Sequence, residues 1–142
     1  MQKIYVDANV FISYWDKEYG RNIGDFLEYF SEEIFQRIIS CEFYLVVSDF
    51  TIKEIKKIMT FSEKDVMFEL NHYDEINKLE VINGTEKFWN KAKELSVKNN
   101  IHLADALHTV LAKESNSTLV TWNLKDFKKV KDIVNVKSPK EL

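Results

Sequence analysis

Short, continuously apolar segments alternate along this chain with longer segments in which apolar residues recur at helical spacing. The apolar segments cover residues 3–6, 43–47 and 118–121, with weaker ones at 79–82 or 134–136. Continuous apolar character is typical of parallel strands covered on both faces. The periodic segments, which we expect to be helices, span residues 24–41, 50–60, 63–77, 86–99 and 103–114. This alternation predicts a three-layer α/β domain.

Polar residues that can cap a helix stand at the start of three of the periodic segments. These residues are Asp49, Ser62 and Thr85. The side-chain oxygen of such a residue can accept a hydrogen bond from a backbone N–H of the first helical turn, which otherwise has no partner within the helix. We therefore expect helices to begin at these three positions.

The composition limits the class of protein. The chain has 142 residues, of which 45% are hydrophobic and 30% charged, and it holds three glycines and one proline. We find no repeat and no break in composition, so we expect residues 1–142 to form a single domain. Cys41 is the single cysteine, which argues against a disulfide framework and against a zinc site built from cysteines.

The same features bear on location and on partners. The first residues do not have the pattern of a signal peptide, and no apolar stretch approaches the roughly 20 residues of a membrane span. We therefore expect a cytoplasmic protein that does not enter a membrane. The net charge of −3 and the pI of about 5.7 argue against nucleic-acid binding over the whole surface. Contact with phosphate would need a local patch or metal ions.

Three polar side chains are predicted to meet at one edge of the sheet. Asp7 directly follows the first apolar strand, Asn123 follows the segment 118–121, and Glu54 lies less than two turns into the helix after 43–47. Ligands of an open parallel sheet bind beyond the carboxyl ends of its strands. On a helical wheel, Glu54 lies beside Ile58 and away from the neighbouring lysines, so we expect it to face inward or to line the boundary.

A fourth polar residue, Asp105, interrupts the nearly all-apolar segment 103–114 in its first turn. The helix dipole stabilises a carboxylate there by about 0.3–1 kcal/mol, which is too little to account for full burial. Several acids at one sheet edge would repel one another unless a cation joined them. Carboxylate oxygens without thiols or clustered histidines suit Mg²⁺ or Mn²⁺.

Each of these residues also has a purely structural interpretation. Asp7 could cap the segment that follows it, Asp105 could cap its own helix, and Glu54 could be a rim residue paired with a lysine. Asn123 and Asp126 have the Asn-x-x-Asp spacing of a capping box. The combination at one edge favours a functional site over these separate interpretations.

Two histidines flank Asp105. His102 and His108 lie six positions apart and do not share a helix face. We expect His108 to be a packed or partly exposed residue. General acid–base catalysis by a histidine is the less favoured hypothesis.

Four segments, in this order along nearly the whole chain, resemble the PIN domain family and within it the small VapC-type toxins. They are the sequence VDANVFI that contains Asp7, the pattern S-x-x-T-x-x-E formed by Ser48, Thr51 and Glu54, the sequence LADALH that contains Asp105, and the pattern LVT-x-N-x-x-DF that contains Thr121, Asn123 and Asp126. The resemblance implies an α/β/α fold around a short parallel sheet and an endoribonuclease that depends on Mg²⁺ or Mn²⁺.

The resemblance also assigns roles to residues. It implies catalytic roles for Asp7, Glu54, Asp105 and Asn123, with Asp7 and Asp105 holding the metal ion directly. Asn123 follows Asp105 by 18 residues, which is the spacing of the family's fourth acidic position. An amide there carries no charge, so the resemblance leaves open whether the site holds one metal ion or two. Two residues of the last segment have supporting roles: Thr121 is expected to bond the first aspartate or the turn backbone, and Asp126 to orient the loop or act through water.

Partners follow from the same resemblance. It implies an RNA substrate, a homodimer and a small antitoxin protein, with the amphipathic region 24–39 forming the dimer and the antitoxin groove. One alternative is a PIN nuclease of RNA processing that has no antitoxin. Another is a catalytically silent PIN fold that binds protein or RNA, an alternative that the amide of Asn123 keeps open.

Overall fold

The computed structural model describes residues 1–18 and 25–142. The strands are β1 (Gln2–Val6), β2 (Phe43–Ser48), β3 (Leu79–Ile82), β4 (Thr118–Val120) and β5 (Val136–Lys137). The α-helices are α1 (Ala8–Glu18), α2 (Asp25–Ile39), α3 (Asp49–Met59), α4 (Glu63–Asp74), α5 (Glu86–Asn99) and α6 (Leu103–Glu114), and the short 3-10 helices are η1 (Lys128–Val130) and η2 (Pro139–Glu141). In the described ranges, none of these helices combines the length and the apolar character needed to cross a membrane.

The five strands form one parallel sheet in the order β3-β2-β1-β4-β5. From β1 the chain builds outward through β2 and β3, and then crosses to the other side of β1 to add β4 and β5. The carboxyl ends of β1 and β4 are therefore the point where the winding direction reverses. Ligands of open α/β sheets bind at such a point.

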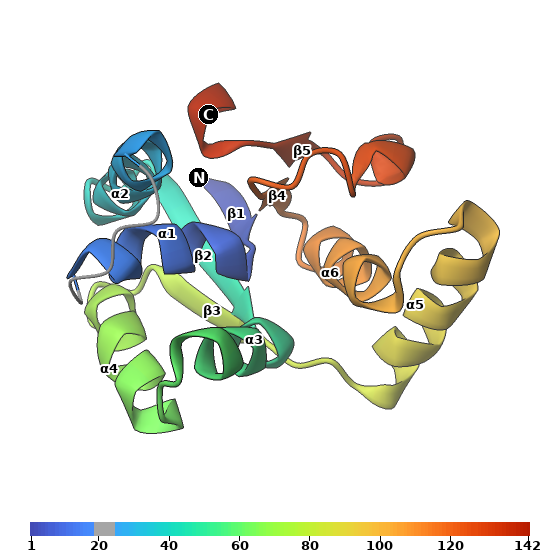
Figure 1. Cartoon of the computed structure of the whole chain (residues 1–142), viewed down its shortest axis with the longest axis horizontal. Helices are drawn as coiled ribbons and strands as arrows, with labels where there is room; N and C mark the ends of the chain where they lie inside the picture. The colour runs from blue at the N-terminus through green and yellow to red at the C-terminus, as the bar shows by residue number, and fades with distance from the viewer. Residues whose placement is uncertain (19–24) are drawn as a thin grey trace.

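Helices cover both faces of the sheet, which gives three layers (Figure 1). On one face, α1, α2, α3 and α4 pack on Ile4 and Val6 of β1. On the other face, α5 and α6 pack on Tyr5 and on neighbouring strands. Side chains alternate between the faces of a strand, so β1 contributes to both cores. The predicted α/β/α fold with a short central parallel sheet is confirmed.

The predicted elements are present, with shifts at their ends. Both weaker segments are strands, one as β3 and the other as β5, which starts at Val136. The helix predicted for 24–41 is α2, which ends at Ile39; its first predicted residue lies outside the described part of the chain. Helix α1 was not among the predicted helices. The sequence pattern assigned its run Val10, Phe11 and Ile12 to no element, and in the structure all three side chains are buried in a helix.

The predicted helix starts are confirmed for α4 and α5 and wrong for α3. Ser62 caps α4 in a capping box with Asp65, and Thr85 takes the cap position of α5 without a side-chain cap bond. For α3 the cap is Ser48, whose Oγ accepts the N–H of Thr51 at 2.9 Å. The predicted cap of α3, Asp49, is instead its first helical residue, because the helix begins one residue earlier than the predicted range 50–60.

Candidate metal centre

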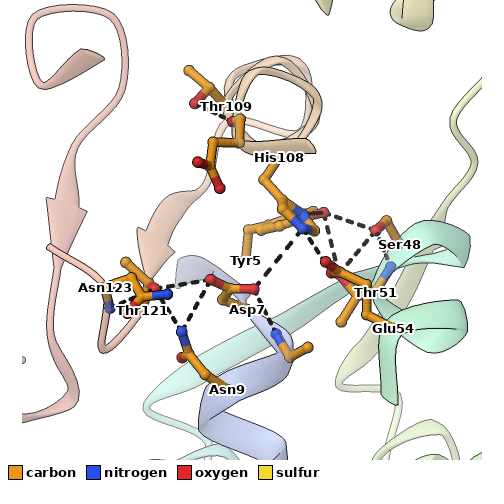
Figure 2. Close-up of polar contacts among 12 residues, drawn as sticks. Tyr5, Asp7, Asn9, Ser48, Thr51, Glu54, His108, Thr109, Thr121 and Asn123 are labelled. Atoms are coloured by element: carbon orange, nitrogen blue, oxygen red, sulfur yellow. Dashed lines mark hydrogen bonds and ion pairs between the residues drawn. The ribbon is translucent and has the colours of Figure 1, made fainter. Parts of the chain in front are cut away.

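The candidate site lies at the carboxyl ends of β1 and β4 (Figure 2). Asp7 is the first residue after β1, and its backbone N–H continues the parallel pairing by bonding the Val120 carbonyl at 2.9 Å. Its side chain is 11% exposed. The sheet itself therefore carries this carboxylate to the point where the winding direction reverses.

Both oxygens of Asp7 accept hydrogen bonds from the protein. Oδ1 accepts the N–H of Ala8 at 2.7 Å, while Oδ2 accepts the hydroxyl of Thr121 at 2.8 Å and the amide of Asn9 at 3.3 Å. Asp7 thus starts α1, in agreement with its structural interpretation, and is oriented by β4 as well. A carboxylate has about four acceptor positions, two on each oxygen. Oδ1 accepts one hydrogen bond from the protein, so its second acceptor position can bind a ligand.

The residues after β4 form a turn. Thr121 makes both contacts expected of it, because its Oγ1 donates to Asp7 and accepts the N–H of Asn123 at 3.0 Å. The backbone N–H of Asp126 bonds the Asn123 carbonyl at 3.2 Å. Asn123 and Asp126 both have exposed side chains, and their segment is a turn that leads to η1 and not the start of an α-helix. The capping-box interpretation is therefore wrong.

Glu54 reaches the site from α3. Its side chain is 30% exposed and its Oε1 lies 2.8 Å from Nε2 of His108. The predicted position at the boundary between core and solvent is therefore confirmed. The contact places Glu54 next to the carboxylate of Asp7, from an element that is distant in sequence.

His108 is the residue at the centre of this group. The imidazole is 2% exposed, and its Nε2 lies 2.8 Å from Glu54 and 3.9 Å from Oδ1 of Asp7. On the other side of the ring, Nδ1 is 2.7 Å from the hydroxyl of Tyr5. That hydroxyl lies 2.7 Å from Oγ of Ser48. His108 is packed, as expected, but it also contacts two of the predicted site residues.

The surroundings of His108 favour its protonated form. Burial alone lowers the pKa of the imidazole, but Tyr5, the hydrogen bond to Glu54 and the nearby carboxylate of Asp7 together hold the pKa well above its ordinary value. A positive charge here balances two acids that would otherwise repel each other.

Asp105 lies in the first turn of α6 and is partly buried. Burial raises the pKa of its carboxyl, and the neighbouring carboxylates of Asp126 and Asp7 raise it further. Asp105 is therefore within electrostatic reach of Asp7 as well as of the turn after β4. A negative charge at this place is unfavourable unless a cation accompanies it.

The donor set fits a divalent metal ion. Among the described residues, Asp7, Glu54 and His108 each offer a ligand atom, and these atoms lie within 4.8 Å of one another. Carboxylate oxygen and imidazole nitrogen are both common ligands of divalent ions. The structure thus brings Asp7 and Glu54 together and places Asp105 within electrostatic reach of Asp7. Asn123 and Asp126 lie on the exposed turn after β4.

Sequence reasoning did not assign His108 to the site, although the sequence contains two signals. His108 follows Asp105 by three positions, so both lie on one face of α6. Tyr5 precedes Asp7 by two positions, so both lie on one face of the sheet. Together these spacings direct the tyrosine, the histidine and both aspartates toward the layer between β1 and α6.

Comparison with known families gives one match over most of the chain. The family model described as PIN domain matches residues 4–133. A comparison with curated proteins gives no significant match.

Solved structures with the same fold include several toxin–antitoxin complexes. VapBC2 from Rickettsia felis, bound to a promoter DNA fragment, has a TM-score of 0.64 at 18% identity, over 96% of this chain and 98% of that one. A toxin–antitoxin complex from Klebsiella pneumoniae has a TM-score of 0.62 at 20% identity, over 98% and 99%. VapBC-1 from nontypeable Haemophilus influenzae has a TM-score of 0.63 at 16% identity, also over 98% and 99%. At these identities the likeness concerns the fold.

Proposed function

The chain belongs to the PIN domain family, and on that premise we propose that it is a metal-dependent endoribonuclease and the toxin of a type II toxin–antitoxin pair. The observation that carries the proposal is the group of acids at the carboxyl ends of β1 and β4. Asp7 and Glu54 meet there, and the raised pKa of Asp105 marks a carboxyl that would be stabilised by a cation. We take residues 1–142 to act as one domain.

In this proposal Asp7 and Asp105 hold a Mg²⁺ or Mn²⁺ ion, and Glu54 and Asn123 complete the catalytic group. A bound divalent cation supplies positive charge that activates the attacking water and offsets the charge that builds on the phosphoryl group. Thr121 fixes the orientation of Asp7 through its 2.8 Å hydrogen bond. Asp126 orients the turn that carries Asn123.

A basic rim beside Asp105 supports RNA as the substrate. A hollow of about 430 Å³ is lined by Asp105 and Asp126 together with Lys125, Lys129 and His102. Lysines next to the acids can contact backbone phosphates on either side of the bond that is cut. This local arrangement lets an acidic protein of net charge −3 bind RNA.

Toxin function is the more specific part of the proposal. The structures with the same fold include complexes of VapC-type proteins with antitoxins, which supports a small antitoxin as the partner of this chain. We propose that it works as a homodimer in the cytoplasm. A small open reading frame directly upstream of the gene, whose product binds this protein and blocks cleavage, would separate a toxin from a nuclease of RNA processing.

The decisive experiment is an RNA cleavage assay with the Asp105→Asn variant. Purified protein is incubated with a mixed RNA pool in Mg²⁺, in Mn²⁺ or in EDTA. We expect cleavage that requires the metal ion and falls by about a hundredfold or more in the variant, because an amide no longer holds the cation firmly. Asp74→Asn, which makes the same change at an exposed position of α4, is expected to cleave like the wild type.

Two outcomes would contradict the proposal. If the wild type is inert with every metal ion and RNA while it still binds RNA or a protein, it is a binding module. If the wild type and Asp105→Asn cleave alike, the cleavage comes from a contaminant or from another site.

A further inference from the structure

From the position of His108 we infer that its Nε2 is a ligand of the metal ion, which makes the centre selective for a divalent transition-metal ion such as Mn²⁺ over Mg²⁺. The inference concerns the metal centre of the proposed function and rests on it. It goes beyond the carboxylate site because it adds a nitrogen ligand from α6.

The first support is the geometry of the ring. Nε2 points into the space between Glu54 and Asp7, at 2.8 Å and 3.9 Å from their oxygens (Figure 2). Atoms that bind one ion with bonds of about 2.1 Å lie up to roughly 4.2 Å apart, so both separations fall within that span.

The second support lies behind the ring. A histidine that binds a metal through one nitrogen donates the N–H of its other nitrogen to a nearby acceptor. Nδ1 of His108 has the Tyr5 hydroxyl at 2.7 Å, and this hydroxyl is in turn 2.7 Å from Oγ of Ser48 and 3.3 Å from Oγ1 of Thr51. Hydroxyl groups both donate and accept. The Tyr5 hydroxyl can therefore accept a hydrogen bond from the N–H of Nδ1. The metal ion then displaces the proton that Nε2 carries in the metal-free protein, and this proton is released to solvent.

The third support is burial. The imidazole is 2% exposed, so its neighbours hold it in a single orientation and little rotamer freedom is lost on binding. The neighbouring residues lie on β1 and α3, and His108 itself is held in place by α6.

Selectivity follows from the chemistry of the ligands. Mg²⁺ is bound in proteins mainly by oxygen and keeps much of its water, whereas imidazole suits transition metals. Mn²⁺ accepts carboxylate oxygen and tolerates nitrogen, which makes it a suitable probe. A site with two carboxylates and one imidazole is therefore expected to bind Mn²⁺ more tightly than Mg²⁺.

Pulsed electron paramagnetic resonance of bound Mn²⁺ tests the inference directly on the unaltered protein. We expect a ¹⁴N coupling that is replaced by a ¹⁵N coupling when the protein is grown with ¹⁵N-histidine. The coupling is expected to vanish in His108→Gln and to persist in His72→Ala, which removes an exposed histidine of α4. A wild-type spectrum without nitrogen coupling would overturn the inference, and this result does not depend on whether a variant folds.

Calorimetric titration with each metal ion gives the second readout. We expect His108→Gln to weaken Mn²⁺ binding by about tenfold or more and Mg²⁺ binding by less than about threefold. Equal losses for both ions would show that His108 acts only by positioning the carboxylates. Nitrogen coupling without RNA cleavage would contradict the proposed function alone. Metal-dependent cleavage without nitrogen coupling would contradict this inference alone.

Discussion

The carboxylate of Asp105 lies where its surroundings disfavour a negative charge. Burial is the main cause, and the charges of Asp126 and Asp7 add to it, so the pKa of this carboxyl is raised. A folded protein that keeps an ionised group in such a place loses stability compared with one that carries a neutral group there. Such a disadvantage is common at functional sites, where the charge is kept for what it binds.

The raised pKa predicts the effect of Asp105→Asn on stability. The folded protein binds a proton at Asp105 more tightly than the unfolded chain, whose pKa is near 3.8. Stability therefore rises as the pH falls through the raised pKa toward 3.8. At pH 7 in EDTA, Asp105→Asn is expected to unfold at a higher urea concentration than the wild type. This advantage should shrink as the pH is lowered toward 3.8.

Metal ions are expected to reverse the order of stability of the wild type and Asp105→Asn. At a hundredfold excess over the dissociation constant, a bound ion adds about 2.7 kcal/mol to the free energy of unfolding. The wild type should gain this amount from Mn²⁺ and Asp105→Asn much less, while Asp74→Asn should behave like the wild type in both conditions. An Asn variant that is no more stable than the wild type in EDTA at pH 7 would contradict the assigned cause of the pKa shift.

At the level of residues, the sequence pattern singles out the acids, whereas it marks the histidine only through its spacing from Asp105. Asp7 ends a strand, and Asp105 interrupts an apolar helix, so each departs from a local pattern. His108 lies between Leu107 and Thr109 in a buried helix and is buried like both of them, so its adjacent residues do not distinguish it. Its role depends on a contact with Glu54, which is 54 positions away in sequence. A contact of that kind is set by how α3 and α6 pack on the sheet.

The caps of α4 and α5 offer a matched comparison at the level of elements. Ser62 accepts the N–H of Asp65 at 3.2 Å, and the Asp65 carboxylate accepts the N–H of Ser62 at 2.9 Å. Thr85 takes the same position in α5 without a side-chain cap bond. Ser62→Ala is expected to lower the free energy of unfolding by about 1 kcal/mol, and Thr85→Ala by much less.

Urea denaturation at pH 7 measures both variants. The Ser62 bonds lower the pKa of Asp65, so the stabilisation that this carboxylate provides is complete above pH 3.8 and is lost as the pH falls through the lowered pKa. Equal losses in the two alanine variants would show that the cap bonds do not stabilise α4.

Helix α1 shows why the pattern alone was insufficient for one element. Its apolar run could equally continue β1, because Val10 and Ile12 are β-branched and prefer strands. The chain turns at Asp7, whose carbonyl accepts the N–H of Val10 at 3.1 Å. The turn follows from the side-chain bonds of Asp7 to Ala8 and Thr121, and the second of these joins segments 114 positions apart.

The whole molecule brings the site together from four separate stretches of chain. Asp7 comes from the end of β1, Glu54 from α3, Asp105 from α6 and Asn123 from the turn after β4. The parallel sheet sets their spacing, because the strands that precede Asp7 and Asn123 are direct neighbours. The order of strands is thus the property of the fold on which the site depends, and the alternation of strands and helices in the sequence predicted the fold class but not this order.

The proposed homodimer gives a prediction for the molecule as a whole. Region 24–39 was assigned to the dimer by resemblance, and in the described part of α2 the side chains of Tyr29 and Ile39 are 63% and 57% exposed. Phe68 on α4 is also a large aromatic residue and is 68% exposed, which makes it a matched control on another helix. Exposed large apolar side chains are typical of surfaces that associate.

Light scattering of the wild type is expected to give about 34 kDa, twice the 16.8 kDa of one chain. Tyr29→Glu is expected to give a monomer, because a charge would be buried without a partner at the interface. Phe68→Glu is expected to remain a dimer. If Phe68→Glu gives the monomer and Tyr29→Glu does not, the dimer forms through α4, and a monomeric wild type would contradict the homodimer altogether.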